Sequence, residues 1–475
     1  MIDYEDFLSK PKSMLVAPAG YGKSYTITAA LEHCSDGRQL ILTHTHAGIA
    51  SLLEKIKEAK IPSSCYHVET IAGFAQKYAL AFTKAVELPD RQDDGFYSWV
   101  NQRVLALFRI KPVRTIIANS YAGLFVDEYQ DCSVEQHQLI NLIAEVLPTR
   151  ILGDHLQGIF NFKGQPLVDM ECVTTMSGYM DNQFVLDTPQ RWQRGNNAAL
   201  GNDLKLIRAA LLAKSAIVIT QYPSVVFYQI EERDLFNPRS DYYRQINLLL
   251  NEESILLLHP ETTSVYPRVS LNKMFRNRMV MIESIDDKDF YNLAKSLDSL
   301  TPANVNKTFI ELLHRLFNKT GIDNWFNDKT LKNKAKPQEK ALSELLRPLL
   351  NELSESVSWS SIAKLLRMVS DLPGVSCTRK EVLQCLIKAL LNAAGDDISV
   401  YDAMVLVRDS IRRIGRKVNG RCFGTTLLTK GLEFDTVALI NAHRFTDPKH
   451  LYVAMTRATR KLVIFSTSST LSPQY

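Results

Sequence analysis

The stretch that decides the fold is Ala17-Pro18-Ala19-Gly20-Tyr21-Gly22-Lys23-Ser24, which lies between a short apolar run and a run with helical spacing. Glycines let the backbone wrap closely around a phosphate, with loop amides and the following helix N-terminus directed at its charge. Lys23 then contacts the β- and γ-phosphates, and the Ser24 hydroxyl takes a Mg²⁺ position. The alternative is an accidental glycine turn, but the lysine and serine in register favour a nucleoside-triphosphate site. We expect its cofactor-binding residues to be Ala19, Gly20, Tyr21, Gly22, Lys23, Ser24 and Tyr25.

A second chemical signal lies where the apolar run 121–127 ends in Asp127 and Glu128. A phosphate-bound Mg²⁺ needs a carboxylate ligand, and Asp127 fits that role. Hydrolysis needs a group that accepts a proton from the attacking water, and Glu128 fits that role. A solvated acidic turn is the alternative, and it loses weight because a phosphate-binding loop precedes the pair.

The first half of the chain alternates strands with helices, which favours a parallel sheet covered on both faces. The predicted strands are 13–17, 39–43, 121–127 and 150–153, and the predicted helices are 23–33, 47–60 and 133–147. A second α/β pattern follows, with strands predicted at 224–230, 254–259, 279–283, 422–427, 437–440 and 461–465.

The fold class is therefore predicted as α/β, with two parallel sheets flanked by helices and two small, mainly helical insertions. We expect residues 1–75 and 111–186 to form the first domain, with 76–110 as its insertion. The second domain is expected to comprise 187–288 and 422–475, with 289–421 as its insertion. That insertion contains helical patterns at 341–350 and 361–370.

Composition excludes several other classes of protein. The chain has 475 residues, 45% of them hydrophobic and 23% charged, which excludes a disordered or fibrous protein. The net charge of +5 is too small to indicate nucleic-acid binding by itself. The seven cysteines include no CxxC pair, which disfavours a disulfide framework or a zinc ribbon. The acidic start and the lack of a long apolar run lead us to expect a cytoplasmic enzyme without membrane contact.

Several segments in order along the chain resemble the UvrD/PcrA/Rep group of superfamily-one DNA helicases. The segments are 17–24, 42–47, 70–74, Asp127-Glu128-Tyr129-Gln130-Asp131, 152–164, 186–191, Thr429-Lys430-Gly431-Leu432-Glu433-Phe434 and 451–458. The resemblance implies two RecA-like P-loop motor domains with ATP and Mg²⁺ between them. It also implies movement on single-stranded or partly duplex DNA in the 3′→5′ direction.

The resemblance assigns further catalytic roles. It implies that Gln157 contacts the γ-phosphate or positions the attacking water. Arg191 and Arg457 are implied to be arginine fingers that offset charge developing during phosphoryl transfer. Glu433 is implied to bond near the ribose or to orient an arginine.

The same resemblance implies a set of nucleic-acid contacts. Aromatic side chains that stack on bases tolerate any sequence, which suits Phe160 and Phe162. For Phe160, a buried core position is an equally good interpretation. The full set of implied DNA contacts is Thr43, His44, Thr70, Phe160, Phe162, Lys163 and Lys430.

Two departures from the family qualify these expectations. No glutamine precedes the loop strand, and Gln190 stands where an aromatic residue often stacks on adenine. We therefore expect tolerance of triphosphates other than ATP. The insertions are trimmed, which is similar to the helicase subunit of Gabija-type antiphage systems and implies an OLD-family ATPase-nuclease (GajA-like) as a partner.

Three functional interpretations remain at this point. The first is an ATP-dependent DNA helicase or translocase in antiphage defence or DNA repair. The second is a DNA-activated NTPase that senses DNA ends and regulates a partner nuclease without processive unwinding. The third, a nucleotide-bound scaffold without turnover, is disfavoured because the set of candidate catalytic residues is intact.

Overall fold

The computed structural model describes residues 2–34, 37–89, 95–160, 166–260, 266–282, 288–327, 330–414 and 420–475. The chain forms two compact units. The first comprises residues 1–262, 413–419 and 429–475, and the second comprises residues 263–412 and 420–428. Among the described residues, no helix has both the length and the apolar character needed to cross a membrane.

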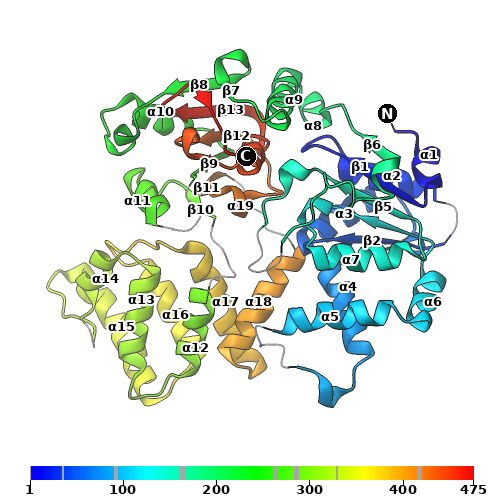
Figure 1. The fold of residues 1–475 in the computed structure, drawn as a ribbon. Helices are drawn as coiled ribbons and strands as arrows, with labels where there is room; N and C mark the ends of the chain where they lie inside the picture. The colour runs from blue at the N-terminus through cyan, green and yellow to red at the C-terminus, as the bar shows by residue number, and fades with distance from the viewer. Residues whose placement is uncertain are drawn as a thin grey trace. The chain divides into compact units, whose positions relative to one another are not determined.

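The first unit opens with a parallel six-stranded sheet in the order β3-β2-β4-β5-β1-β6. Figure 1 labels β1, β2, β5 and β6 of this sheet. Its strands are β1 (Lys12–Val16), β2 (Gln39–Thr43), β3 (Tyr66–Thr70), β4 (Gly123–Val126), β5 (Thr149–Gly153) and β6 (Gln183–Val185). Its helices are α1 (Tyr4–Ser9), α2 (Lys23–Glu32), α3 (His46–Glu58), α4 (Ile71–Ala81), α5 (Phe96–Phe108), α6 (Lys111–Ser120) and α7 (Val134–Ala144). Because the strands are parallel, their carboxyl ends meet at one edge, where ligands of such sheets bind.

Alternation along the strands divides the apolar side chains between the two faces of this sheet. Met14 and Val126 pack on the face covered by α4, α5, α6 and α7. Leu15 and Phe125, each one residue away in the chain, pack on the face covered by α1, α2 and α3. The helices of the expected insertion 76–110 therefore share a core with the sheet itself.

The first unit also holds a second parallel sheet, in which β9, β12, β13 and β8 are neighbours in that order. These strands are β8 (Val225–Gln229), β9 (Ile255–Leu258), β12 (Phe434–Leu439) and β13 (Ala458–Ser466). The accompanying elements are α8 (Gln190–Arg194), α9 (Ala198–Leu212), α10 (Asp241–Leu249), α20 (Pro448–Met455) and the antiparallel pair β7 (Ile217–Val218) and β14 (Thr470–Leu471). Side chains and backbone of residues 187–212 and 429–458 contact residues at the carboxyl ends of the strands of the first sheet.

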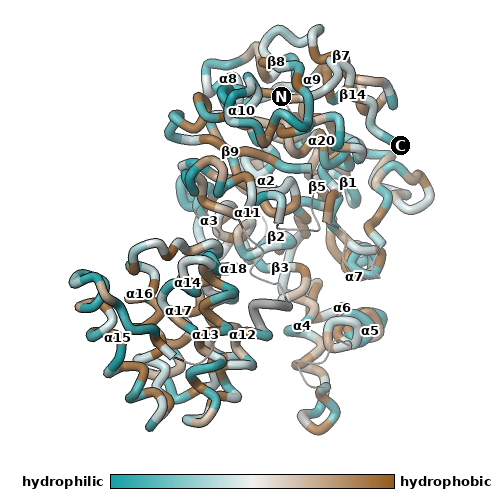
Figure 2. The backbone as a smooth tube through the Cα atoms, turned by 90° about the vertical axis from the view of Figure 1, so that its left-hand side faces the viewer, coloured by the Kyte–Doolittle hydropathy of each residue, from teal (hydrophilic) through white to brown (hydrophobic). Residues whose placement is uncertain are grey.

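The second unit is mainly helical and has its own core. Its helices are α11 (Tyr266–Met274), α12 (Lys288–Asp298), α13 (Val305–Leu316), α14 (Lys319–Trp325), α15 (Pro337–Glu355), α16 (Trp359–Ser370), α17 (Lys380–Asp396) and most of α18 (Val400–Ile414). Figure 2 shows hydrophilic and hydrophobic residues alternating along α13, α15 and α16, as expected for amphipathic helices. Their apolar residues form one large cluster that includes Phe309 and Trp325. The strands β10 (Val280–Met281) and β11 (Arg421–Gly424) pair in parallel.

The predicted α/β fold class is confirmed, with parallel sheets flanked by helices as in RecA-like domains. Some elements differ from the sequence expectations. The strand predicted at 422–427 ends at Gly424, and the chain turns into the short helix α19 (Thr426–Thr429). The strands β3 and β6 were not predicted, because β6 is only three residues long and β3 includes the polar residues His67 and Glu69. Pro337 lies at the start of α15, where its missing N–H costs no hydrogen bond.

Candidate nucleotide site

The phosphate-binding loop leaves β1 and ends at Gly22, which is the N-cap of α2. Gly20 has a φ of 77° and Gly22 has a φ of 98°, both in the left-handed region that favours glycine. Lys23 and Ser24 then form the first turn of α2, so the sequence folds here into the expected strand, turn and helix. This turn directs the positive end of α2 toward the loop.

The helix α8 packs tightly against this loop. A Cβ atom on Gly20 would lie 2.7 Å from Cζ3 of Trp192, so no larger residue fits there. The backbone N–H of Arg191 donates to the carbonyl of Gly20 at 2.9 Å. Gln190 starts α8, and a Cβ on Gly22 would lie 3.8 Å from its Cγ. The residue expected to affect base selectivity therefore lies beside the loop.

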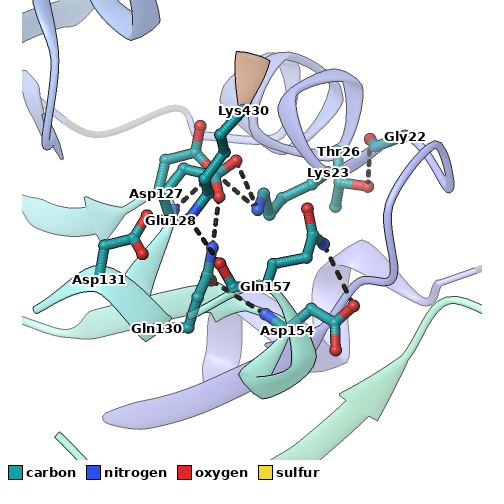
Figure 3. A network of polar contacts seen from close by, with 10 residues as sticks. All are labelled: Gly22, Lys23, Thr26, Asp127, Glu128, Gln130, Asp131, Asp154, Gln157 and Lys430. Carbon is teal, nitrogen blue, oxygen red and sulfur yellow. Dashed lines mark hydrogen bonds and ion pairs between the residues drawn. The ribbon is translucent and has the colours of Figure 1, made fainter. Parts of the chain in front are cut away.

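The Lys23 ammonium contacts the two carboxylates at the end of β4 (Figure 3). Its Nζ lies 2.7 Å from Oε1 of Glu128 and 3.8 Å from Oδ1 of Asp127. The Lys23 and Asp127 side chains are only 9% and 5% exposed. The cation and both candidate carboxylates are thus brought together at the end of β4.

Electrostatics separates the two carboxylates. Burial raises the pKa of Asp127 to about 6, against the opposing effect of Lys23. Burial would also raise the pKa of Glu128, but Lys23 and then Lys430 outweigh it and lower the pKa to about 2. Burial would lower the pKa of Lys23, but Glu128 and Asp127 outweigh it and raise the pKa. At neutral pH the Lys23–Glu128 pair is therefore charged.

A chain of amides links these carboxylates to the end of β5. The Gln130 side chain donates from Nε2 to Glu128 and accepts at Oε1 from the backbone N–H of Asp154 at 3.0 Å. The Gln157 Nε2 donates to Oδ2 of Asp154 at 3.1 Å. Gln157 is thereby held near the acidic strand end, where the family resemblance expects it (Figure 3).

Lys430 joins this network from the second half of the chain. Its ammonium donates to the Asp131 carboxylate and to the backbone carbonyl of Gln157, the latter at 2.6 Å. It also lies 4.6 Å from the centre of the Phe160 ring, a distance at which a cation and an aromatic face attract. The Lys430 side chain is only 7% exposed. This lysine therefore lies inside the protein, although it was expected to contact a DNA backbone.

The two candidate arginine fingers have different surroundings. Arg191 donates to Oε1 of Glu433 at 2.6 Å and to the carbonyl of Thr456 at 2.7 Å. Arg457 is 3% exposed and donates to the carbonyls of Val453 and Leu432 at 3.0 and 3.2 Å. Burial, and then the charge of Arg191, lower the pKa of Arg457 to about 10, so it stays protonated at neutral pH.

Several expected DNA contacts have internal roles in this structure. Thr43 is 1% exposed, and Thr70 is the N-cap of α4, where its hydroxyl accepts from the N–H of Gly73 at 2.9 Å. Nε2 of His44 lies 3.5 Å from the sulfur of Cys132. Burial, and then Lys430, lower the pKa of His44 to about 3, so it is neutral. Phe162 and Lys163 lie outside the described residues.

Sequence reasoning missed the residues that support the site. Gln130 and Asp131 lie in a motif but carried no assigned role. Gln130 bonds to the candidate base Glu128, and Asp131 bonds to Lys430. Arg208 carried no motif signal at all, yet it pairs with Asp154. Its helix α9 was not predicted from the sequence, and no short motif shows that a charged residue turns inward.

The residues present suit a nucleotide with Mg²⁺. The left-handed loop, the buried lysine and two carboxylates beside the helix N-terminus match the needs of a triphosphate. Ser24 and Asp127 supply hard oxygen ligands of the type that Mg²⁺ prefers. Within the described ranges, no cluster of three or more His, Cys, Asp and Glu side chains is placed to hold a metal ion.

Comparisons with known proteins agree with this picture. Residues 4–163 match the model of an AAA domain, and residues 386–466 match that of a viral superfamily 1 RNA helicase core domain. The first match spans Lys23, Glu128 and Gln157, and the second spans Lys430 and Arg457. Together the two matches show a similarity to the domains of superfamily 1 helicases and support nucleotide binding. No curated protein sequence matches the chain.

Among solved structures, similar chains include two helicases. One is Arterivirus nonstructural protein 10, a helicase in complex with DNA, at 11% identity and a TM-score of 0.36, covering 97% of this chain. This chain spans only 63% of the length of that protein. The other is the Pif1 helicase from Candida albicans, at 12% identity and a TM-score of 0.38, covering 98% of this chain and 94% of that one.

Proposed function

We propose that this protein is an ATP-hydrolysing motor of the UvrD-like kind that translocates 3′→5′ on single-stranded DNA. The observation that carries the proposal is the network of Lys23, Glu128, Gln157 and Lys430. It joins the phosphate-binding loop to segments that the family resemblance assigns to DNA. A motor needs such a connection, because nucleotide chemistry has to change the grip on the strand.

Hydrolysis follows from the chemistry of the carboxylates. A bound γ-phosphate competes with Glu128 for the Lys23 ammonium, because both are anions at short range. Once separated from Lys23, Glu128 loses the first of the two charges that lower its pKa and becomes a better base for water. Gln157 orients that water or the phosphate. Ser24 and Asp127 would hold Mg²⁺, which when bound would supply charge stabilisation at the phosphate oxygens.

The two arginines complete the proposed site. Arg191 is tethered to the loop by its backbone and held at its guanidinium by Glu433. We propose that a bound nucleotide draws this guanidinium toward the γ-phosphate, which is a stronger anion than an exposed carboxylate. Arg457 is held more tightly and contributes after release of its backbone partners.

The test is hydrolysis and strand displacement measured together on wild type and Lys23→Ala. We expect single-stranded DNA to stimulate hydrolysis by wild type and the variant to lose it. A circular dichroism spectrum like that of wild type shows that the variant keeps its fold, although loss of the buried Lys23 cation lowers its melting temperature. Duplexes with a 3′ or a 5′ tail assign the direction, and RNA substrates test the preference for DNA. Absence of DNA-stimulated hydrolysis in wild type would overturn the proposal.

Two finer features of the proposal have their own tests. Gln190 beside the loop offers no aromatic face to adenine, so we expect GTP and ATP to be hydrolysed at comparable rates; strict dependence on ATP contradicts this. The similarity to Gabija-type helicase subunits supports an OLD-family nuclease partner in antiphage defence. Hydrolysis without displacement, together with activation of such a nuclease, would favour a regulatory NTPase over a processive helicase.

A further inference from the structure

A buried ion pair next to the nucleotide site has no role in the proposed mechanism. Nη2 of Arg208, on α9, lies 2.8 Å from Oδ1 of Asp154 at the end of β5. The Asp154 side chain is fully buried and the Arg208 side chain is 14% exposed. Removing one member of a buried pair leaves an uncompensated charge, so the pair constrains its neighbours strongly.

Asp154 is held on three sides. Its Oδ1 accepts from Arg208 and from the backbone N–H of Leu156 at 3.4 Å, and its own backbone N–H donates to Gln130. These bonds leave Oδ2 directed at Nε2 of Gln157, which lies 3.1 Å away (Figure 3). The rotamer of Asp154, and with it the position of the Gln157 amide, thus depends on Arg208.

Arg208 also interacts with two tyrosines at the phosphate-binding loop. Its charge acts on Tyr21 in the loop and on Tyr452 in α20, and Tyr452 hydrogen-bonds to the backbone of Ala19. Burial would lower the pKa of Arg208, but Asp154 outweighs it and raises the pKa. Within the described part of the chain, Nε of Arg208 is buried without a hydrogen-bond partner. The guanidinium therefore pairs with Asp154 even though burial of its unbonded Nε destabilises the folded state.

We propose that Arg208 is a positioning residue for hydrolysis, which acts through Asp154 to hold the Gln157 amide in its working orientation. This inference rests on the proposed function, because Gln157 matters only in an enzyme that hydrolyses nucleotide. Arg208 comes from the half of the chain that follows the first sheet, whereas Asp154 and Gln157 belong to the first sheet. The orientation of Gln157 therefore depends on how the two halves pack.

The test is the kinetics of Arg208→Met, which keeps the aliphatic stem and removes the charge. We expect kcat for DNA-stimulated hydrolysis to fall about tenfold or more, while binding of a fluorescent ATP analogue changes less than about threefold. Arg208→Lys restores a cation and should recover part of kcat. The matched control is Lys205→Met on the same helix, whose Nζ lies 2.6 Å from Asp187 in an exposed pair; we expect no effect.

A double-mutant cycle separates positioning from simple stabilisation. In a Gln157→Ala background, Arg208→Met should cause little further loss of kcat, because the group it positions is already absent. Full additivity, or unchanged kcat in folded Arg208→Met, overturns the inference while leaving the proposed function intact. If Arg208→Met does not fold, the same cycle with Arg208→Lys decides. Absence of hydrolysis in wild type overturns both.

Discussion

The two buried lysines of the site, Lys23 and Lys430, both form ion pairs with carboxylates, but their pKa values shift in opposite directions. Each ammonium pairs with a carboxylate of the segment after β4, Lys23 with Glu128 and Lys430 with Asp131. The pKa of Lys23 is raised, because two carboxylates outweigh burial, whereas the pKa of Lys430 is lowered, because burial outweighs Asp131. The surroundings of Lys23 stabilise its charged form, whereas burial destabilises the charged form of Lys430.

This difference teaches how the two lysines divide their tasks. A phosphate entering the loop finds Lys23 fully charged and needs only to displace a carboxylate. Lys430 instead contacts the Gln157 carbonyl and the Phe160 ring. A movement of Lys430 would therefore displace both Gln157 in the hydrolysis site and the segment that contains Phe160. The first lysine is suited to binding, and the second is suited to coupling.

The largest expected effect comes from removing the partner of Lys23. Glu128→Gln keeps the shape but removes the base, so we expect kcat for hydrolysis to fall by about 10²–10⁴-fold. Binding of nucleotide should persist or tighten, because Lys23 no longer has a competing anion. Stopped-flow hydrolysis and equilibrium binding measure the two effects. Weakened binding with normal kcat would mean that Glu128 is not the base.

Lys430→Met tests the coupling side of the comparison. We expect nucleic-acid stimulation of hydrolysis to fall by about 5–150-fold, the range of ordinary coupling energies, with a smaller change in basal hydrolysis. The matched control is Lys461→Met, which removes another lysine–carboxylate pair, with Nζ 3.0 Å from Glu252, away from the site. Equal losses of basal and stimulated rates would assign Lys430 to chemistry rather than coupling.

Asp131→Asn tests the partner of Lys430 through the pH dependence of stability. Burial, only partly offset by Lys430, raises the pKa of Asp131 to about 7, above its unfolded value. The folded state therefore holds more protons between about pH 4 and 7, and wild-type stability falls as pH rises through that window. The variant should lose a contribution of up to about 1.4 kcal/mol per pH unit. Denaturant unfolding at several pH values measures it, and parallel curves contradict the assignment.

The smallest expected effect is at His44, whose pKa is lowered to about 3 by burial and then by Lys430. The unfolded state holds more protons between about pH 3 and 6.5, so this group makes stability rise with pH, opposite to Asp131. In His44→Gln, the free energy of unfolding should therefore fall by about 1–2 kcal/mol less than in wild type when the pH is lowered to 5. In Lys430→Met the His44 pKa, followed by NMR, should rise, because a repelling charge is gone. An unchanged value would show that burial acts alone.

Much of the site could be predicted because its chemistry is local. Residue type and spacing identify the loop from Ala19 to Ser24 and the pair Asp127–Glu128 in the sequence. In the structure, Nζ of Lys23 lies 2.7 Å from Oε1 of Glu128. Roles assigned to the nucleic-acid contacts remain predictions. For Thr43, Thr70 and Lys430 the structure adds internal partners that no short motif reveals.

By itself the sequence determined the alternation of strands and helices, the glycine loop and the order of the motifs, because backbone preference and hydrophobic periodicity act over a few residues. Only the tertiary structure decided which charges meet. The contact of Lys430 with Asp131 and that of Arg208 with Asp154 join residues separated by 299 and 54 positions. Such pairs depend on burial and distance, which packing creates and which linear spacing does not encode.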